Sequence, residues 1–258
     1  MDIKPLMQIA EKAAFEAGKA IMDVYGSSDF STELKNNKSP VTKADKNAHQ
    51  LITEYLKETH LSVLSEEGSD TNFLERRSWE YFWLIDPLDG TKEFINKNGE
   101  FTVNIALLKQ NKPLGGIIYR PSTGTLYTGS KETGVYKIKN GTQTQLSPLT
   151  KRTTFDELLK KDCVRIVASR SHPSPETKLF ADKFKNVTLL TMGSALKFML
   201  LLENEADIYP RYGTTMEWDT AAAHAILNAS NRGVYQLDLR SELMYNKPDL
   251  RNPFFISF

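Results

Sequence analysis

The run from Trp83 to Phe94, WLIDPLDGTKEF, places two carboxylates where an apolar segment ends. Pro87 cannot continue the hydrogen-bond ladder of a strand, and the Asp-Gly pair two residues later is typical of a turn. Asp86, Asp89 and the main-chain carbonyl of Leu88 are therefore expected to converge on one place, where each presents an oxygen ligand. Taken alone, a turn that leads into a helix cap is the more economical explanation.

Two further groups of acidic residues follow the same pattern. Glu66 and Glu67 come directly after the strand-like Val63-Leu64, and Asp219 opens a helix of very small residues. A surface acidic pair and a helix N-cap would explain them one by one. Together with the first pair, however, such carboxylates would repel one another severely unless cations neutralised them. Oxygen ligands without His or Cys favour Mg²⁺ or a similarly hard ion. The proposed cluster is Glu66, Asp86, Asp89 and Asp219.

The first half of the chain is expected to form helices followed by an antiparallel sheet. Apolar residues recur every three or four positions from Leu6 to Val24, which predicts a long amphipathic helix that ends at Gly26. The same spacing predicts a second helix over 48–56. Short apolar runs predict strands at 63–64, 81–85, 101–108, 115–119, 125–128 and 135–138.

From about residue 151 the pattern changes to alternating strands and helices. Strands are predicted at 164–168, 187–190 and 207–209, and helices at 176–184, 195–202 and 219–229. We place a boundary at 147–150, which gives an N-terminal α+β domain (1–150) with most of the acidic cluster and a smaller C-terminal α/β domain (151–258). Ligand sites commonly lie between two such parts.

Composition narrows the function classes. The 258 residues carry 33 Lys+Arg and 32 Asp+Glu, a formal net charge of +1, with a hydrophobic share of 40%. A disordered polyelectrolyte is excluded, and no overall field draws in nucleic acid or an acidic membrane.

Cys163 is the single cysteine, so an internal disulfide is impossible, and we expect it to be buried in a strand. With no signal core or bilayer-spanning stretch, we expect a cytoplasmic protein without integral membrane association; a peripheral position on the inner membrane stays open.

Four motifs in order carry a resemblance to a known family. Ser39–Asp45 (SPVTKAD), Ser65–Glu67 (SEE), Asp86–Thr91 (DPLDGT) and Trp218-Asp219 resemble those of the inositol monophosphatase superfamily of Mg²⁺-dependent, lithium-sensitive phosphatases. The resemblance implies the layered αβαβα sandwich of the sugar phosphatases. Within it, the run DGTKEFI followed by NGEFTVN resembles the CysQ-type 3'(2'),5'-bisphosphate nucleotidases, where inositol monophosphatases usually have Gly-Thr-Thr-Asn-Phe. One departure is the segment 228–233, where many members have a glycine pair.

The resemblance also implies roles for individual residues. Two or three Mg²⁺ ions would be held by Glu66, Asp86, Asp89, Asp219 and the carbonyl of Leu88. Thr91 with Asp45 behind its hydroxyl would activate a water, with Glu66 as a further catalytic residue. The main-chain N–H groups of Gly90 and Thr91, at a helix start, would contact the phosphate.

The second half is expected to bind the rest of the substrate. The segments around His172 and Gly193-Ser194 resemble nucleoside-contacting parts of bisphosphate nucleotidases, and Lys197 and Arg211 are candidates for the second phosphate. The carboxylates, Leu88, Gly90 and Thr91 would contact the same substrate. Simpler explanations stay open: a loop histidine, a helix cap at Ser194, a solvated cation at Lys197, and an Arg211–Glu217 ion pair.

The function implied is removal of the 3'-phosphate of adenosine 3',5'-bisphosphate to give AMP, with the sulfated precursor as a further substrate. Two alternatives stay open. One is an inositol monophosphatase or sugar-bisphosphate phosphatase of the same superfamily, and the other is a non-catalytic nucleotide sensor. The partner is thus a small nucleotide rather than nucleic acid, and the oligomeric state is not predicted.

Overall fold

The centre of the molecule is a seven-stranded sheet with strand order β3-β4-β5-β6-β7-β8-β9. The computed structural model describes residues 1–27, 33–34, 40–68, 71–169 and 175–258. Strand β3 runs parallel to β4, and each later neighbour is antiparallel. The strands are β3 (Ser62–Ser65), β4 (Tyr81–Asp89), β5 (Thr102–Lys109), β6 (Lys112–Arg120), β7 (Thr125–Ser130), β8 (Gly134–Lys139) and β9 (Thr142–Leu146).

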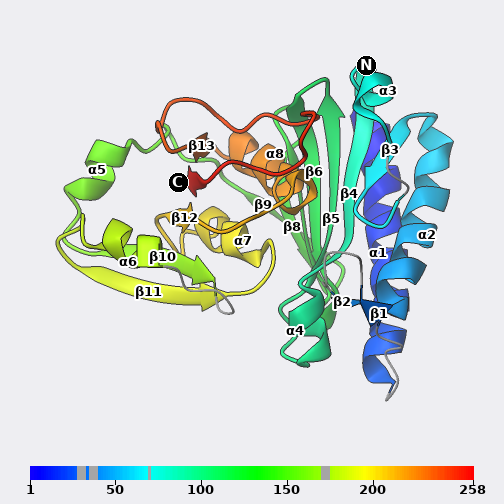
Figure 1. The fold of residues 1–258 in the computed structure, drawn as a ribbon, viewed down its shortest axis with the longest axis horizontal. Coiled ribbons are helices and arrows are strands. Elements are labelled where there is room, and N and C mark those ends of the chain that lie inside the picture. The colour runs from blue at the N-terminus through cyan, green and yellow to red at the C-terminus, as the bar shows by residue number, and fades with distance from the viewer. Residues whose placement is uncertain (28–32, 35–39, 69–70, 170–174) are drawn as a thin grey trace.

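Helices α1 (Lys4–Gly26) and α2 (Lys43–Leu56) cover one face of this sheet (Figure 1). Alanines on α1 at spacings of three and four, Ala10, Ala13 and Ala17 among them, are fully buried. Their small side chains let the helix lie close to the sheet and to α2. A two-stranded ribbon, β1 (Glu33–Leu34) and β2 (Pro40–Val41), precedes α2.

Helices α7 (Leu196–Leu202) and α8 (Ala221–Ala229) lie on the opposite face. The contact of α8 with β6 is very close, because a Cβ added to Gly116 would stand 2.0 Å from the carbonyl oxygen of Ala222. Glycine on the strand and alanines on the helix therefore make this packing possible. The helix that follows Asp219 is thus fixed on the large sheet, although it comes from the last part of the chain.

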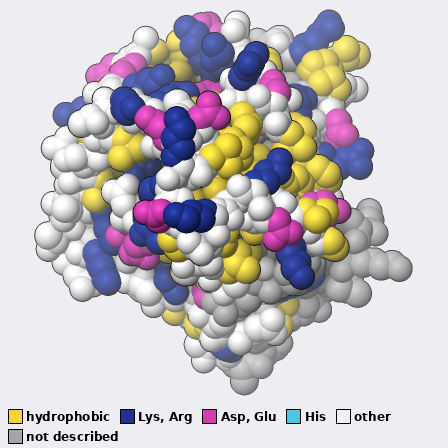
Figure 2. Space-filling model, turned by 90° about the vertical axis from the view of Figure 1, so that its left-hand side faces the viewer, with side chains coloured by type: hydrophobic (Ala, Val, Ile, Leu, Met, Phe, Trp, Pro, Cys, Tyr) yellow, Lys and Arg dark blue, Asp and Glu magenta, His cyan; other side chains and the backbone are white. Residues whose placement is uncertain are grey.

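Two smaller sheets form the next layer. One pairs β10 (Val164–Ser169) with β11 (Val187–Met192) in parallel, and the other has the antiparallel order β12 (Tyr209–Arg211), β14 (Phe255–Ser257), β13 (Val234–Gln236). Their outer side packs against α5 (Phe155–Leu159) and α6 (Pro175–Ala181) through a separate apolar cluster. Figure 2 shows this outer side, where basic, acidic and apolar side chains are interspersed. The expected layered sandwich is confirmed.

Most predicted elements are present, with differences that have local causes. The last helix begins at Ala221 rather than 219, because Glu217–Asp219 form a separate 3-10 turn, η3. The sequence did not predict five short elements, because they lack a distinct apolar pattern. These are strands β9, β13 and β14 and helices α3 (Phe73–Arg76) and α5. Cys163 is exposed, contrary to expectation, because β10 begins only at the next residue. Among the described helices none is long and apolar enough to cross a bilayer.

Candidate active site

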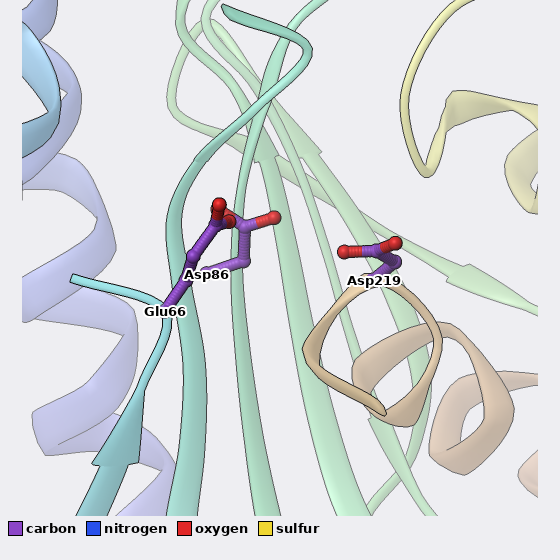
Figure 3. Close-up of side chains that lie close together, drawn as sticks. All are labelled: Glu66, Asp86 and Asp219. Atoms are coloured by element: carbon purple, nitrogen blue, oxygen red, sulfur yellow. The ribbon is translucent and has the colours of Figure 1, made fainter. Parts of the chain in front are cut away.

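Three of the four predicted acidic residues meet at one edge of the large sheet. Carboxylate oxygens of Glu66, Asp86 and Asp219 all lie within 4.8 Å of one another, and their side chains converge in Figure 3. Glu66 follows β3, and its N–H donates to the carbonyl of Ile85 at 3.2 Å, which sets it beside Asp86 on the parallel neighbour β4. Asp219 ends turn η3 and arrives from the other side with α8.

A bulge in β4 explains how Asp86 and Asp89 serve one site. In a regular strand, residues three apart point to opposite faces. Here Asp86 pairs with Asn104 and Asp89 with Thr102, so three steps on β4 match two on β5. The extra residue in this Asp-Pro-Leu-Asp segment resets the alternation and turns both acids to the same side. Asp89 is not part of the 4.8 Å group, and it accepts a hydrogen bond from Asn104 Nδ2 at 3.4 Å.

Mutual repulsion among the carboxylates of the cluster favours binding of a cation. Burial, and then the charges of Glu66, Asp89 and Asp219, raise the pKa of Asp86 well above its usual range. Burial and the charges of Asp89 and Glu66 do the same for the pKa of Asp219. Burial raises the pKa of Asp89 to about 6, against the opposing charge of Lys197. Oxygen donors that repel one another this strongly fit a hard divalent cation such as Mg²⁺.

Thr91 and Asp45 are in contact, as the family resemblance implied. Thr91 Oγ1 donates to Asp45 Oδ1 at 3.2 Å and lies 3.4 Å from the carbonyl oxygen of Leu88. The other oxygen of Asp45 accepts from the N–H and the hydroxyl of Thr42 at 2.7 and 2.6 Å, in a capping box that begins α2. The cap therefore fixes Asp45 so that one carboxylate oxygen remains directed at Thr91.

Gly90 connects the acidic strand to the short helix α4 (Thr91–Ile95). Its φ of +93° lies in the left-handed region, and an added Cβ would stand 3.1 Å from the carbonyl oxygen of Glu100. Glycine suits both demands. Main-chain N–H contact from Gly90 and Thr91 to a phosphate stays a prediction.

A pocket adjoins the acidic cluster. Its lining includes Asp89, Gly90, Gly193, Ser194, Lys197, Tyr209, Arg211, Asp219 and Phe255. Lys197 is buried rather than solvated, and burial lowers the pKa of its ammonium while the charge of Asp89 opposes that shift. A buried cation beside the half-buried carboxylates of Asp89 and Asp219 gives the pocket both signs of charge.

Arg211 has no carboxylate partner in the described part of the chain. Glu217 pairs instead with Lys247, so the predicted Arg211–Glu217 alternative is wrong. Arg211 Nη2 donates to the carbonyl of Thr214 at 3.3 Å, and its buried Nε lacks a hydrogen-bond partner among the described residues. The guanidinium thus keeps donors for an anion in the pocket.

Gly193 and Ser194 join the two halves of the chain at the pocket. The N–H of Gly193 donates to Glu100 Oε2 at 2.7 Å, and Ser194 adopts a positive φ of 47°. The N–H of Leu196 donates to Ser194 Oγ at 3.5 Å, but the N-cap position of α7 is Ala195, so Ser194 is not the helix cap. His172, like Ser39, falls outside the described residues, whereas Ser169 lines the pocket.

Comparison with known proteins agrees with this arrangement. A model of the inositol monophosphatase family matches residues 2–251. The chain belongs to the inositol monophosphatase family. Members of this family are metal-dependent. The crystal structure of one bacterial member, CysQ from Bacteroides thetaiotaomicron, shares 41% sequence identity with this chain, with a TM-score of 0.83 over 98% of this chain and 97% of its own.

Two further relatives in the inositol monophosphatase family are 3'(2'),5'-bisphosphate nucleotidases named CysQ. That of Salmonella typhimurium is 40% identical over 89% of both chains. That of Haemophilus influenzae is 36% identical over 94% of this chain and 88% of its own. SuhB of Bartonella henselae, at 22% identity and a TM-score of 0.74, shares the fold.

Some residues of the site were not anticipated from the sequence. Tyr209 and Phe255 form apolar walls of the pocket, and Glu100 ties Gly193 in place. The aromatic residues sit in short strands that look like core segments. Glu100 precedes a predicted strand in the run NGEFTVN, and this position was the one signal in the sequence for its place at the pocket.

Proposed function

We propose that this protein is a Mg²⁺-dependent phosphatase that removes the 3'-phosphate of adenosine 3',5'-bisphosphate, giving AMP and phosphate, with the corresponding 3'-phosphorylated 5'-phosphosulfate as a second substrate. The convergence of Glu66, Asp86 and Asp219 within 4.8 Å beside the Thr91–Asp45 pair carries the reaction class. The likeness to the CysQ nucleotidases supports the nucleotide as substrate.

Thr91 would hold the attacking water. Because its proton is committed to Asp45, the hydroxyl oxygen has lone pairs free to accept a hydrogen bond from water. A threonine hydroxyl is a weak base by itself, so the proton removed from the water would pass toward the buried Asp45. The water oxygen then bonds to phosphorus, the bond to the 3'-oxygen breaks, and that oxygen takes a proton.

The metal ligands would be Glu66, Asp86, Asp89, Asp219 and the Leu88 carbonyl, for two or three ions. Mg²⁺ bound there would supply positive charge that favours deprotonation of water and stabilises the departing oxygen. Glu66 follows the four-residue strand β3, and its N–H hydrogen bond to Ile85 holds it beside Asp86. It would contribute to both metal binding and catalysis.

The rest of the nucleotide would lie between the two parts of the chain, 1–150 and 151–258. Buried Lys197 and half-buried Arg211, whose Nε has no hydrogen-bond partner among the described residues, would bind the second phosphate. Tyr209 and Phe255 offer apolar surface in the same pocket. Gly193, Ser194 and His172 would complete the contacts with the nucleoside.

The substrate assignment is tested by phosphate release from adenosine 3',5'-bisphosphate beside inositol 1-phosphate, with Mg²⁺ and with or without lithium. We expect kcat/KM to favour the nucleotide and lithium to inhibit. A clear preference for inositol 1-phosphate would instead identify an inositol monophosphatase. Binding of the nucleotide without turnover would identify a sensor.

The metal-site assignment is tested by Asp89→Asn, which is nearly isosteric but lacks a charge. We expect turnover to fall below detection while the chain stays folded, because the cluster loses part of its attraction for cations. Turnover and thermal melting check this, with the exposed Asp182→Asn as a matched control. Activity like that of the unmodified protein would contradict the assignment.

A further inference from the structure

A chain of buried polar side chains runs from the surface to the residue beside Asp219. His224 on α8 is fully buried, with Nδ1 2.9 Å from the hydroxyl of Tyr245. The hydroxyl oxygens of Tyr245 and Thr220 lie 3.3 Å apart. Thr220 follows Asp219 directly and stands, in a non-helical conformation, between turn η3 and the start of α8.

The outer end of this chain is a carboxylate held by other groups. Glu242 Oε2 lies 3.4 Å from His224 Nε2, and Glu242 Oε1 accepts from Arg152 Nη1 at 2.6 Å. Arg152 Nη2 in turn donates to Asn228 Oδ1 at 2.9 Å. The neighbouring His224 ring and the Arg152 guanidinium lower the pKa of Glu242 to about 2, so it is an anion at neutral pH.

The carboxylate determines which ring nitrogen of His224 carries the proton. Burial lowers the pKa of His224, so the ring is neutral near pH 7 and has one N–H. A bare Nε2 lone pair facing the Glu242 anion would be repelled, so the proton belongs on Nε2. Nδ1 is then an acceptor and takes the hydroxyl proton of Tyr245.

Thr220 is the next member of this network. Its Oγ1 lies 3.3 Å from the Tyr245 hydroxyl, and its own proton is donated to the carbonyl of Glu217. Thr220 Oγ1 also accepts from Asn252 Nδ2 at 3.1 Å, and it lies 3.2 Å from the carbonyl oxygen of Glu217 in its own turn. The segments of Tyr245 and Asn252 thus meet the turn of Thr220 itself at one side chain next to Asp219.

We propose that His224 and Tyr245 are positioning residues that act through Thr220 to orient Asp219 for cation binding. Hydrogen bonds connect Asn252, Thr220, Tyr245 and His224, and the Glu242 carboxylate lies 3.4 Å from His224 Nε2 at the outer end. This inference rests on the proposed role of Asp219 as a metal ligand, but it is independent of which substrate is hydrolysed. Partners one shell outside the ligands are known to tune metal affinity by orienting them.

The test measures Mg²⁺ binding directly, by calorimetric titration of the purified protein without substrate. Tyr245→Phe removes one hydroxyl and keeps the ring, and we expect its Kd for Mg²⁺ to rise roughly tenfold. Thr220→Val should show the same rise, whereas Thr220→Ser, which retains the hydroxyl, should bind like the unmodified protein. Tyr127→Phe is the matched control, because Tyr127 is another mostly buried tyrosine, bonded to Glu203 away from the site.

Enzyme kinetics provide the second readout. In Tyr245→Phe the half-saturating Mg²⁺ concentration should rise, while kcat at saturating Mg²⁺ recovers and KM for the substrate is unchanged.

A purely structural role would lower the melting temperature and leave the Kd unaltered. Folded Tyr245→Phe and Thr220→Val proteins with a Kd within about twofold of the original would overturn the proposal. If Tyr245→Phe does not fold, the Thr220→Val and Thr220→Ser pair decides alone. Absence of Mg²⁺ binding by the unmodified protein would overturn it together with the metal site.

Discussion

At the scale of single residues, the proposed chemistry depends on the contact between Thr91 and Asp45. Thr91 occupies a position where its hydroxyl proton is held by a carboxylate that is itself fixed by a helix cap. The threonine oxygen thereby keeps its lone pairs as hydrogen-bond acceptors. Removal of this one hydroxyl should therefore affect catalysis far more than substrate binding.

We expect Thr91→Val to lower kcat by roughly 10²- to 10⁴-fold, the usual contribution of a positioned proton-transfer group. KM should change little, because the acids and the pocket remain. Thr91→Ser retains the hydroxyl and should keep much of the activity. Steady-state kinetics of both variants, with nucleotide binding measured separately, check this; equal activity of Thr91→Val and Thr91→Ser would argue against the role.

Residue types alone could indicate a cation site but could not decide between explanations for individual side chains. Lys197 could have been a solvated cation on a helix, and its burial became visible only with α7 packed between the sheets. Whether Glu217 was available to pair with Arg211 depended on Lys247. This lysine binds Glu217 although it lies 30 residues further along the chain. The burial and the ion-pair partners of these side chains are determined by tertiary contacts that the local sequence does not encode.

At the scale of elements, the close contact between β6 and α8 determines where Asp219 lies. Gly116 allows the helix backbone to approach, and α8 begins two residues after Asp219. A larger residue at this position would have to move the helix, because the clashing atoms belong to its backbone.

We expect Gly116→Ala to lower the free energy of unfolding by roughly 2 kcal/mol or more, the cost of overpacking a tight contact. Mg²⁺ affinity should fall as well, since the displaced helix carries Asp219 with it. Gly26→Ala is the control, because an added Cβ there meets nothing within 4 Å. Denaturant melts and Mg²⁺ titrations measure both effects; a Gly116→Ala protein as stable as Gly26→Ala would refute the packing argument.

Periodicity in the sequence predicted the long helices and central strands, because their buried faces are large. It could not predict the β4 bulge, since the same letters also describe a strand that simply ends in a turn. The bulge is visible only from the pairing of Asp86 and Asp89 with β5. Short elements such as β13 and β14, of three residues each, were missed because they contain too few positions for a pattern.

At the scale of the whole molecule, the buried acids make stability depend on pH and on metal. The raised pKa values of Asp86, Asp89 and Asp219 mean that the folded, metal-free protein binds more protons than the unfolded chain. Stability is therefore lost as pH rises from the ordinary aspartate value of 3.8 through the Asp89 value of about 6. Cations that bind only the folded state restore it.

We accordingly expect Mg²⁺ to raise the melting temperature more at about pH 7.5 than at about pH 5. Thermal melts with and without a chelator at both pH values measure the difference. In Asp89→Asn the metal-free protein should lose less stability between these pH values, because one of the repelling charges is gone. An identical pH dependence in Asp89→Asn and the unmodified protein would show that the cluster does not govern it.

Composition describes this molecule poorly. A net charge of +1 and a mixed outer surface (Figure 2) say nothing of an interior site where several acids face a buried lysine. The family motifs identified that site in outline, whereas the pocket walls and the ties between the two halves required the folded structure.

The position of α8 on the large sheet also divides the pocket between two layers. The proposed metal ligands belong to the large sheet or to segments packed against it, although Asp219 comes 130 residues after Asp89 in the sequence. The strands β10 and β11, with α6, lie in another layer, and Ser169 of β10 lines the pocket. The groups proposed to hold a cation and this part of the pocket wall are thus carried by different layers of the fold, so that one can change in sequence without the other.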